Sequence, residues 1–208
     1  MKYFVIAIVA VLFAGCASPK LVSSWKSPDA DSYAVYKVLV VGMTQDEEIR
    51  TVFETRLRDA LRAKGFEAER SMELFDKEFT TSEKTEADLN EVEQRLLAEG
   101  FDAILLTKVV GSENRETFRR RIGNIDNLYN QFSNDYLDNQ SVYYDTNYYD
   151  TFKIYTAETS LYCICLEKER ALVWRGNINV AEPVKLEKTI DSYIKVIEDS
   201  MQKEAILF

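Results

Sequence analysis

The segment 37–110 alternates short apolar runs with amphipathic stretches, and this alternation limits the possible folds more than any other feature of the chain. Val38–Val41 is an unbroken apolar run that ends at Gly42, a pattern typical of a strand buried on both faces. Apolar residues then recur at helical spacing as far as Gly65. The pattern repeats with a short strand at 66–68, a helix that ends near 99 and a buried strand at 103–110. The sequence therefore predicts a parallel β-α-β-α-β core with the 38–41 strand in its centre.

Capping signals mark where the two helices of this core begin. Thr44 precedes Glu47 by three residues, which is the spacing of a capping box, so we expect Thr44 to cap the first helix. The second helix is expected to begin near Thr85. Between the short strand and this helix, the polar connection 70–84 is long enough to cover one end of the sheet.

The second half of the chain predicts an antiparallel addition to this core. Residues 152–166 and 171–180 alternate as two strands of a hairpin, and 186–205 is amphipathic at helical spacing. The predicted fold class is a mixed α/β domain, in which an antiparallel hairpin extends the parallel core and the C-terminal helix packs on the sheet. Cys163 and Cys165 are interpreted as packed thiols, because a disulfide between residues two apart on one strand is strained.

Composition excludes several classes of function. The net charge of −9 argues against a nucleic-acid partner, whose phosphates require a basic surface. The chain has no histidine, which excludes a Ser-His-Asp triad and every His-ligated metal site. Its seven glycines are not clustered into a phosphate-binding loop or a dinucleotide fingerprint. No cofactor and no metal site is expected.

The N-terminus has the organisation of a lipoprotein signal peptide. Lys2 precedes an apolar run at 4–13, and Ala14-Gly15-Cys16 matches the bacterial lipobox, although Phe13 departs from its usual aliphatic residue. We expect residues 1–15 to be removed and Cys16 to be acylated, which anchors the protein stably in a membrane. Because Ala17 and not an aspartate follows the cysteine, we expect the outer membrane, with the body facing the periplasm.

The mature chain divides into a tether and one domain. Residues 16–36 are predicted to be a tether, in which 23–28 can add an edge strand that ends at Pro28. Residues 37–208 are predicted to form a single α/β domain with an insertion at 122–151.

The insertion is rich in Tyr, Asn and Asp and lacks the periodicity of its neighbours. Tyrosine and asparagine are favoured in adaptable binding loops, so we expect this segment to bind a protein partner and the α/β body to be stable without it. The alternative left open is an insertion that is disordered or packs its rings on itself or on the sheet. The six candidate binding residues are Tyr129, Tyr136, Tyr143, Tyr144, Tyr148 and Tyr149.

Several motifs carry a family resemblance. Beyond the lipobox, they are Ser24-Trp25-Lys26-Ser27-Pro28, Lys37–Gly42, Asp102–Thr107, Glu158–Tyr162 and Leu172-Val173-Trp174. In these motifs the chain resembles a group of uncharacterised bacterial envelope lipoproteins, and its element order is loosely similar to the α/β domain of the curli secretion lipoprotein. The resemblance implies an envelope location and an α/β fold, and it brings no catalytic residues with it.

Three hypotheses of function follow. The first is a membrane-anchored envelope lipoprotein with a non-catalytic protein-binding or assembly role. The second is a small-molecule binding domain, with its ligand near Gly42 and Thr107 at the carboxyl ends of the parallel strands. The third is a hydrolase that uses paired carboxylates such as Asp46 and Glu47.

Overall fold

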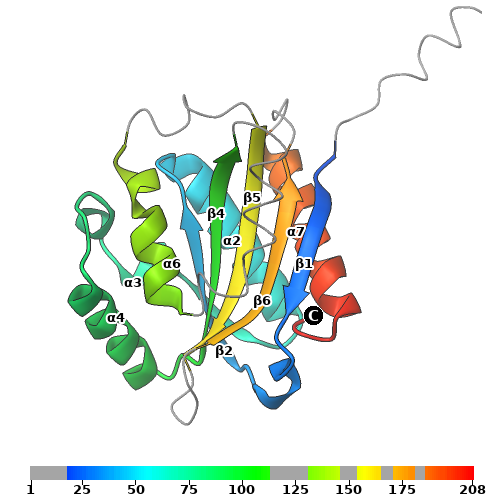
Figure 1. Cartoon of the computed structure of the whole chain (residues 1–208), viewed down its shortest axis with the longest axis horizontal. Helices are drawn as coiled ribbons and strands as arrows, with labels where there is room; N and C mark the ends of the chain where they lie inside the picture. Colours follow the sequence, from blue (N-terminus) through cyan, green and yellow to red (C-terminus); the bar gives the residue numbers. More distant parts are fainter. Residues whose placement is uncertain (1–17, 113–130, 146–153, 165–170, 181–185) are drawn as a thin grey trace, which may run out of the picture.

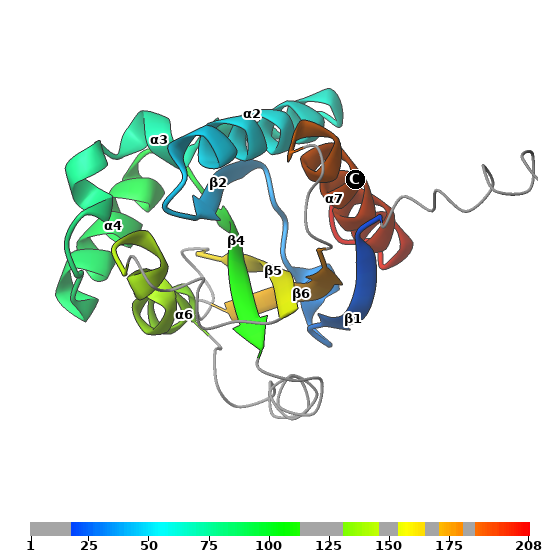
Figure 2. The same ribbon diagram turned by 90° about the horizontal axis from the view of Figure 1, so that it is seen from above.

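One mixed sheet lies between two layers of helices (Figures 1 and 2). The computed structural model describes residues 18–112, 131–145, 154–164, 171–180 and 186–208. The sheet has six strands in the order β1-β6-β5-β4-β2-β3. Their bounds are β1 Lys20–Lys26, β2 Lys37–Met43, β3 Glu67–Arg70, β4 Ala103–Ser112, β5 Ile154–Cys163 and β6 Ala171–Asn179.

The direction of the strands confirms the predicted mixed α/β class. β2 pairs in parallel with both β3 and β4, so the 38–41 segment is the middle strand of the parallel core as expected. β4 then pairs antiparallel with β5, and β5 pairs antiparallel with β6, which is the predicted hairpin extension. Val38 and Val40 face one layer of helices while Leu39 and Val41 face the other, which explains why the run is apolar throughout.

The helices cover the two faces of the sheet separately. On one face, α2 (Glu47–Ala63) and α7 (Leu186–Lys203) pack over a core that includes Leu57, Leu61, Ile194 and Ile197. On the other face lie α4 (Glu86–Ala98) and α6 (Phe132–Asn139). The remaining short helices are η1 Ala30–Ser32, α3 Ser71–Leu74, η2 Lys77–Thr80 and η4 Gln140–Tyr143. Figure 2 shows α2 and α7 together on one side and α4 and α6 together away from them.

The helix starts agree with the sequence in one case and differ in the other. Thr85 caps α4 in a complete capping box, in which the Asp88 side chain accepts from the Thr85 backbone. The prediction that Thr44 caps α2 is wrong, because the Asp46 side chain accepts hydrogen bonds from the backbone N–H groups of Glu48 and Ile49. A carboxylate at this place also interacts favourably with the helix dipole.

The predicted tether is shorter than the sequence suggested. The body of the protein begins at Pro19, which is buried, and β1 follows at once as an edge strand paired with β6. Trp25 of β1 is half-buried and packs against the core on the α4–α6 face. Most of the 16–36 range therefore belongs to the folded domain, and the optional edge strand at 23–28 is part of a longer one.

Two further findings concern a cysteine and the lengths of the helices. Cys163 is buried in β5 and disulfide-bonded, so its interpretation as a free packed thiol is wrong, and its partner cysteine lies outside the described residues. Within the described ranges, the structure holds no helix with both the length and the apolar character needed to cross a bilayer.

Candidate functional site

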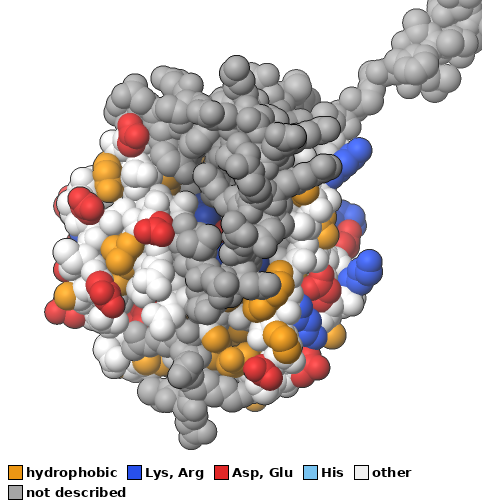
Figure 3. Space-filling view, in the orientation of Figure 1, with side chains coloured by type: hydrophobic (Ala, Val, Ile, Leu, Met, Phe, Trp, Pro, Cys, Tyr) orange, Lys and Arg blue, Asp and Glu red, His pale blue; other side chains and the backbone are white. Residues whose placement is uncertain are grey.

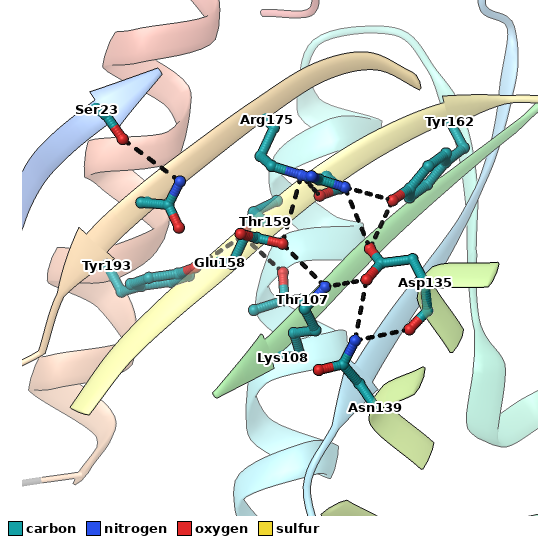
Figure 4. A network of polar contacts seen from close by, with 12 residues as sticks. Ser23, Thr107, Lys108, Asp135, Asn139, Glu158, Thr159, Tyr162, Arg175 and Tyr193 are labelled. Atoms are coloured by element: carbon teal, nitrogen blue, oxygen red, sulfur yellow. Dashed lines mark hydrogen bonds and ion pairs between the residues drawn. The ribbon is translucent and has the colours of Figure 1, made fainter. Parts of the chain in front are cut away.

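Four charged side chains are buried together on the α6 face of the sheet, and we call them the four-charge cluster. They are Lys108 of β4, Asp135 of α6, Glu158 of β5 and Arg175 of β6 (Figure 4). Strand register explains why the three strand residues meet. Lys108 lies directly opposite Glu158, and Arg175 lies opposite Ser160, two residues further along β5 on the same face.

Asp135 is the residue that joins the strands to the helix. Its Oδ1 atom accepts a hydrogen bond from Lys108 Nζ, and its Oδ2 atom lies 3.4 Å from Arg175 Nη2. Glu158 Oε1 closes the cluster from the other side, 2.9 Å from Lys108 Nζ and 3.4 Å from Arg175 Nε. The cluster holds two positive and two negative charges, so it is neutral as a unit.

Uncharged groups complete the hydrogen bonding of the cluster. The Tyr162 hydroxyl donates to Asp135 Oδ2 at 2.5 Å and accepts from Arg175 Nη2 at 2.8 Å. Arg175 Nε donates to Ser160 Oγ at 2.9 Å. Asn139, one turn along α6, donates from Nδ2 to both the backbone oxygen and Oδ1 of Asp135. The Asp135 carboxylate therefore accepts hydrogen bonds at both oxygens.

The surroundings keep Lys108 and Asp135 in their charged forms. Burial by itself lowers the pKa of Lys108, but the carboxylates of Glu158 and Asp135 outweigh it and raise that pKa. Burial by itself raises the pKa of Asp135, but Lys108 and Arg175 hold it below its ordinary value. Burial raises the pKa of the Tyr162 phenol well above its ordinary value. At neutral pH the phenol is therefore protonated and Asp135 is a weak base.

The chemistry of this cluster suits a structural role, in which it holds α6 on the sheet, better than a catalytic role. A general acid or base works best when its pKa lies near the working pH. The pKa of Asp135 is instead lowered, which takes it further from neutral pH. Separating a buried ion pair leaves an uncompensated charge in a medium of low polarity, which is costly. The cluster thus ties α6 to three adjacent strands.

The carboxyl ends of β2 and β4, where a small-molecule ligand was hypothesised, are filled by protein groups. The backbone N–H of Gly42 donates to Glu54 Oε1 at 2.9 Å, and its carbonyl accepts from the Tyr143 hydroxyl at 3.4 Å. Arg50 Nε donates to the same Glu54 oxygen at 3.0 Å. Thr107, which pairs with Gly42 in the β2–β4 ladder, shares a hydrogen bond with Thr159 on the α2–α7 face of the sheet.

An apolar hollow lies between β2, α4 and α6, beside these groups. The ring of Tyr143 covers the Arg50 guanidinium, whose carbon lies 5.4 Å from the ring centroid. The hollow is lined by Leu39, Val41, Arg50, Ser71, Phe75, Phe79, Thr80, Leu89, Val92, Phe132, Tyr136 and Tyr143. Phe75 and Phe79 come from the connection 70–84, which was expected to cover one end of the sheet.

The paired carboxylates of the hydrolase hypothesis have structural partners. Asp46 is the N-cap of α2, and Glu47 forms an exposed ion pair with Lys77 at 2.6 Å. Among the residues that the structure describes, no group of three or more Cys, Asp or Glu side chains is arranged to hold a metal ion.

The tyrosines predicted as binding residues have different environments. Tyr136 of α6 is only 4% exposed and belongs to the core, so its ring is not part of an accessible surface. Tyr143 is half-buried over Arg50, whereas Tyr144 is 40% exposed. Cys16, Tyr129, Tyr148 and Tyr149 lie outside the described residues.

The described part of the insertion, 131–145, packs into the body, which corrects the expectation of an independent α/β support. Phe132, Tyr136 and Val142 are buried in the core of the α4–α6 face, and Asp135 has no exposed surface. This agrees with the alternative in which the rings pack on the sheet. Deletion of 124–149 removes these side chains and leaves two buried cations with Glu158 as their remaining carboxylate.

Sequence reasoning did not find the four-charge cluster. Lys108 and Arg175 stand at inward-facing positions of otherwise apolar strands, and this was the available signal. A buried charge requires a partner, but Asp135 is 27 residues from Lys108 along the chain and lies in a segment without clear periodicity.

Comparisons with known proteins identify similar structures and no family. No protein-family model and no curated protein matches the chain. Among solved structures, it is similar to the PelC dodecamer from Paraburkholderia phytofirmans, with 11% identity, a TM-score of 0.45, and coverage of 86% of this chain and 94% of that one. A substituted PelC dodecamer from the same organism gives 11% identity, the same coverage and a TM-score of 0.42. Because both TM-scores are below 0.5, nothing about this chain is inferred from the likeness.

Proposed function

We propose that this protein is a lipid-anchored lipoprotein of the bacterial envelope that binds another protein without catalysing a reaction. The lipobox at Cys16 and the preceding apolar run support the anchor. The absence of Asp after the cysteine supports the outer membrane, with the body in the periplasm. The proposed binding surface surrounds Tyr144, at the end of η4.

The observation that carries this proposal is that Tyr144 is presented on a fixed base. The backbone N–H groups of Tyr144 and Asp145 both donate to the carbonyl of Ser141, at 3.2 and 2.8 Å, which closes the turn around η4. Gln45 Nε2 donates a hydrogen bond to the carbonyl of Asp145, which holds the turn against the start of α2. Upstream, α6 is held by the four-charge cluster.

A fixed aromatic ring is a suitable contact for a partner. A tyrosine has few side-chain torsions to freeze on binding, and a fixed backbone lowers the entropy cost further. Tyr144 is one of only four large apolar or aromatic side chains that are clearly exposed in the described part of the chain, beside Leu21, Val22 and Tyr36.

The experiment is a cross-linked pull-down from solubilised envelope with Tyr144→Ala as bait. We expect recovery of the partner to fall at least tenfold while the melting temperature stays within a few degrees of the unsubstituted protein. Tyr36→Ala is the matched control, because Tyr36 is 72% exposed, precedes β2 and lies at the opposite end of the strands. Equal recovery with both variants would reject Tyr144 as the contact.

The anchor has its own test. Cys16→Ser removes the acylated thiol, so we expect the protein to move from the membrane fraction to the soluble periplasmic fraction and to lose incorporation of labelled fatty acid. Ser18→Ala is the matched control, because it changes a residue beside the proposed anchor and leaves every cysteine in place. Unchanged fractionation of the Cys16 variant would contradict the anchor and leave the pull-down result standing.

A further inference from the structure

The folded body begins very close to the proposed acylation site. Pro19 is already buried, and β1 starts at the next residue. Three residue steps separate Cys16 from Pro19, which span at most about 11 Å when the chain is fully extended. The polar headgroup layer of a bilayer is itself about 5 to 8 Å thick on each side. Even when fully extended, the spacer therefore leaves the body within a few ångströms of the headgroup layer.

We propose that the start of β1 lies on the surface of the bilayer that carries the anchor, with Leu21 and Val22 in contact with lipid. This inference rests on the proposed acylation of Cys16 and adds to it an orientation of the whole domain. In this arrangement the lipid interface covers the exposed side chains of Leu21 and Val22. The following observations favour lipid over another protein.

The two side chains are unusually exposed for their type. Leu21 is 39% exposed and Val22 is 44% exposed, and they are consecutive in the chain, five and six residues after Cys16. Burial of apolar surface in a lipid interface is favourable, as it is in a protein core. Two adjacent apolar side chains beside an acyl anchor supply a second contact that fixes the orientation.

The local geometry of β1 disfavours the other obvious occupant, the edge strand of a second copy. The register of β1 against β6 shifts between Leu21 and Ser23, so Val22 is an extra residue in the ladder. Such a bulge bends and twists an edge strand, and proteins use bulges to prevent edge-to-edge pairing. The exposed pair thus lies at the bulge of an edge that is poorly shaped for another strand.

The distribution of charge also favours the β1 side as the side that lies on the membrane. Asp46, Glu47 and Glu48 are exposed at the start of α2, which lies at the same end of the strands as Lys20. They follow β2, four strands away from β1, which corresponds to about 19 Å across the sheet. Figure 3 shows mainly acidic side chains on the α4–α6 side, whereas the β1 side shows acidic and basic side chains together and most of the Lys and Arg visible outside the grey part. An anionic membrane therefore repels the β1 side less than the α4–α6 side.

The test measures the depth of a tryptophan in the membrane. Full-length acylated Val22→Trp and Tyr36→Trp proteins are placed in phosphatidylcholine vesicles whose acyl chains are brominated near the headgroup, because bromine quenches tryptophan by contact. The signal of the unsubstituted protein, which contains Trp25 and Trp174, is subtracted. Both positions are exposed, so folding is checked by circular dichroism and is expected to be unchanged.

We expect quenching of the added tryptophan to be at least twice as large at position 22 as at position 36. Ten Gly and Ser residues inserted between Ala17 and Ser18 should reduce the quenching at position 22 to the level of position 36, since the longer spacer releases the body. Equal quenching in proteins that float with the vesicles would overturn the orientation and leave the anchor intact. Failure to float would overturn the anchor and the orientation together.

Discussion

The carboxylate of Asp135 on α6 is hydrogen-bonded to the ammonium of Lys108 on β4, and both side chains are almost fully buried. This contact joins a helix from the Tyr-rich insertion to the middle of the sheet. Arg175 and Tyr162 contact the insertion at the same residue, through the second oxygen of the Asp135 carboxylate. The stability of the fold and the placement of the proposed binding surface therefore depend on one aspartate.

Asp135→Asn should destabilise the protein strongly. The amide keeps the shape of the side chain but removes the charge that compensates Lys108 and Arg175, and disruption of a buried ion pair of this kind costs about 3 to 5 kcal/mol of unfolding free energy. Urea denaturation followed by circular dichroism measures the loss. Asp138→Asn, on the exposed side of the same helix, is the control and should change the value by less than about 0.5 kcal/mol. A loss below about 1 kcal/mol for position 135 would show that the cluster is not compensated as described.

The contribution of Asp135 should disappear in acid. Its pKa is lowered in the folded state, so the folded protein binds the proton less readily than the unfolded chain does. Its stabilisation is therefore complete above the unfolded carboxyl pKa of about 4, and it is lost as the pH falls through the lower folded value. The difference in unfolding free energy between the unsubstituted protein and Asp135→Asn should be constant from about pH 5 to 8 and narrow below pH ~4. A constant difference down to strong acid would contradict the lowered pKa.

The alkaline limit should come from Lys108 and Tyr162. The folded-state pKa of each is raised, so both contributions are present below the unfolded values, which are near ~10, and are lost as the pH rises through the folded values. Tyrosinate absorbance should show Tyr162 titrating only with unfolding. A Tyr162→Phe variant identifies its share of the absorbance change. If the absorbance change of Tyr162 occurs at a lower pH than the loss of the circular dichroism signal, the phenol is not held in its neutral form.

Gly176→Ala should destabilise the β1–β6 side of the sheet. A methyl group at Gly176 would lie 2.2 Å from the Cη2 atom of the Trp174 ring, which is fully buried and donates through Nε1 to Glu204. Overpacking of this kind typically costs about 1 to 3 kcal/mol. Thermal denaturation of both single variants and of the double variant with Trp174→Phe measures the coupling. The smaller ring should recover part of the loss, and strictly additive effects would show that the ring is not the obstacle.

Thr85→Ala should weaken α4 by about 1 kcal/mol, because it removes the side-chain half of the capping box. Thr81→Ala, an exposed threonine just upstream, is the control. Amide hydrogen exchange should show faster exchange confined to the first turn of α4. Exchange that speeds up equally across the sheet would mean that the cap supports global rather than local stability.

The elements with strong periodicity were predictable from the sequence. The run at 38–41 is apolar on both sides because each face of β2 contacts a layer of helices, and the 171–180 strand and the C-terminal helix follow from the same reasoning. The mixed sheet and the position of β2 between β3 and β4 followed from these segments. In each of these segments, the pattern of apolar residues within the segment itself determines which side chains are buried.

The segments whose burial depends on distant residues were not predictable. α6 has eight residues, too few for a periodic pattern to stand out, and its inward face includes Asp135, which reads as solvent-exposed until Lys108 and Arg175 are placed beside it. β1 contains two serines and two lysines, and it becomes a strand because β6 offers it a free edge. The candidate site was missed for the same reason, since its charges come from four separate elements.

The pairing of β1 with β6 also limits the order in which the strands of the sheet can assemble during folding. Lys20 pairs with Asn179 and Lys26 with Trp174, so the ladder joins positions separated by most of the sequence. Contacts of such long range form late in folding, because the entropy of closing the intervening loop is lost before any contact compensates for it. In a chain that leaves the translocation channel N-terminus first, the proposed acylation of Cys16 would take place while β1 is still unpaired. The parallel βαβ units can assemble meanwhile, and the first strand to be synthesised is among the last to join the sheet.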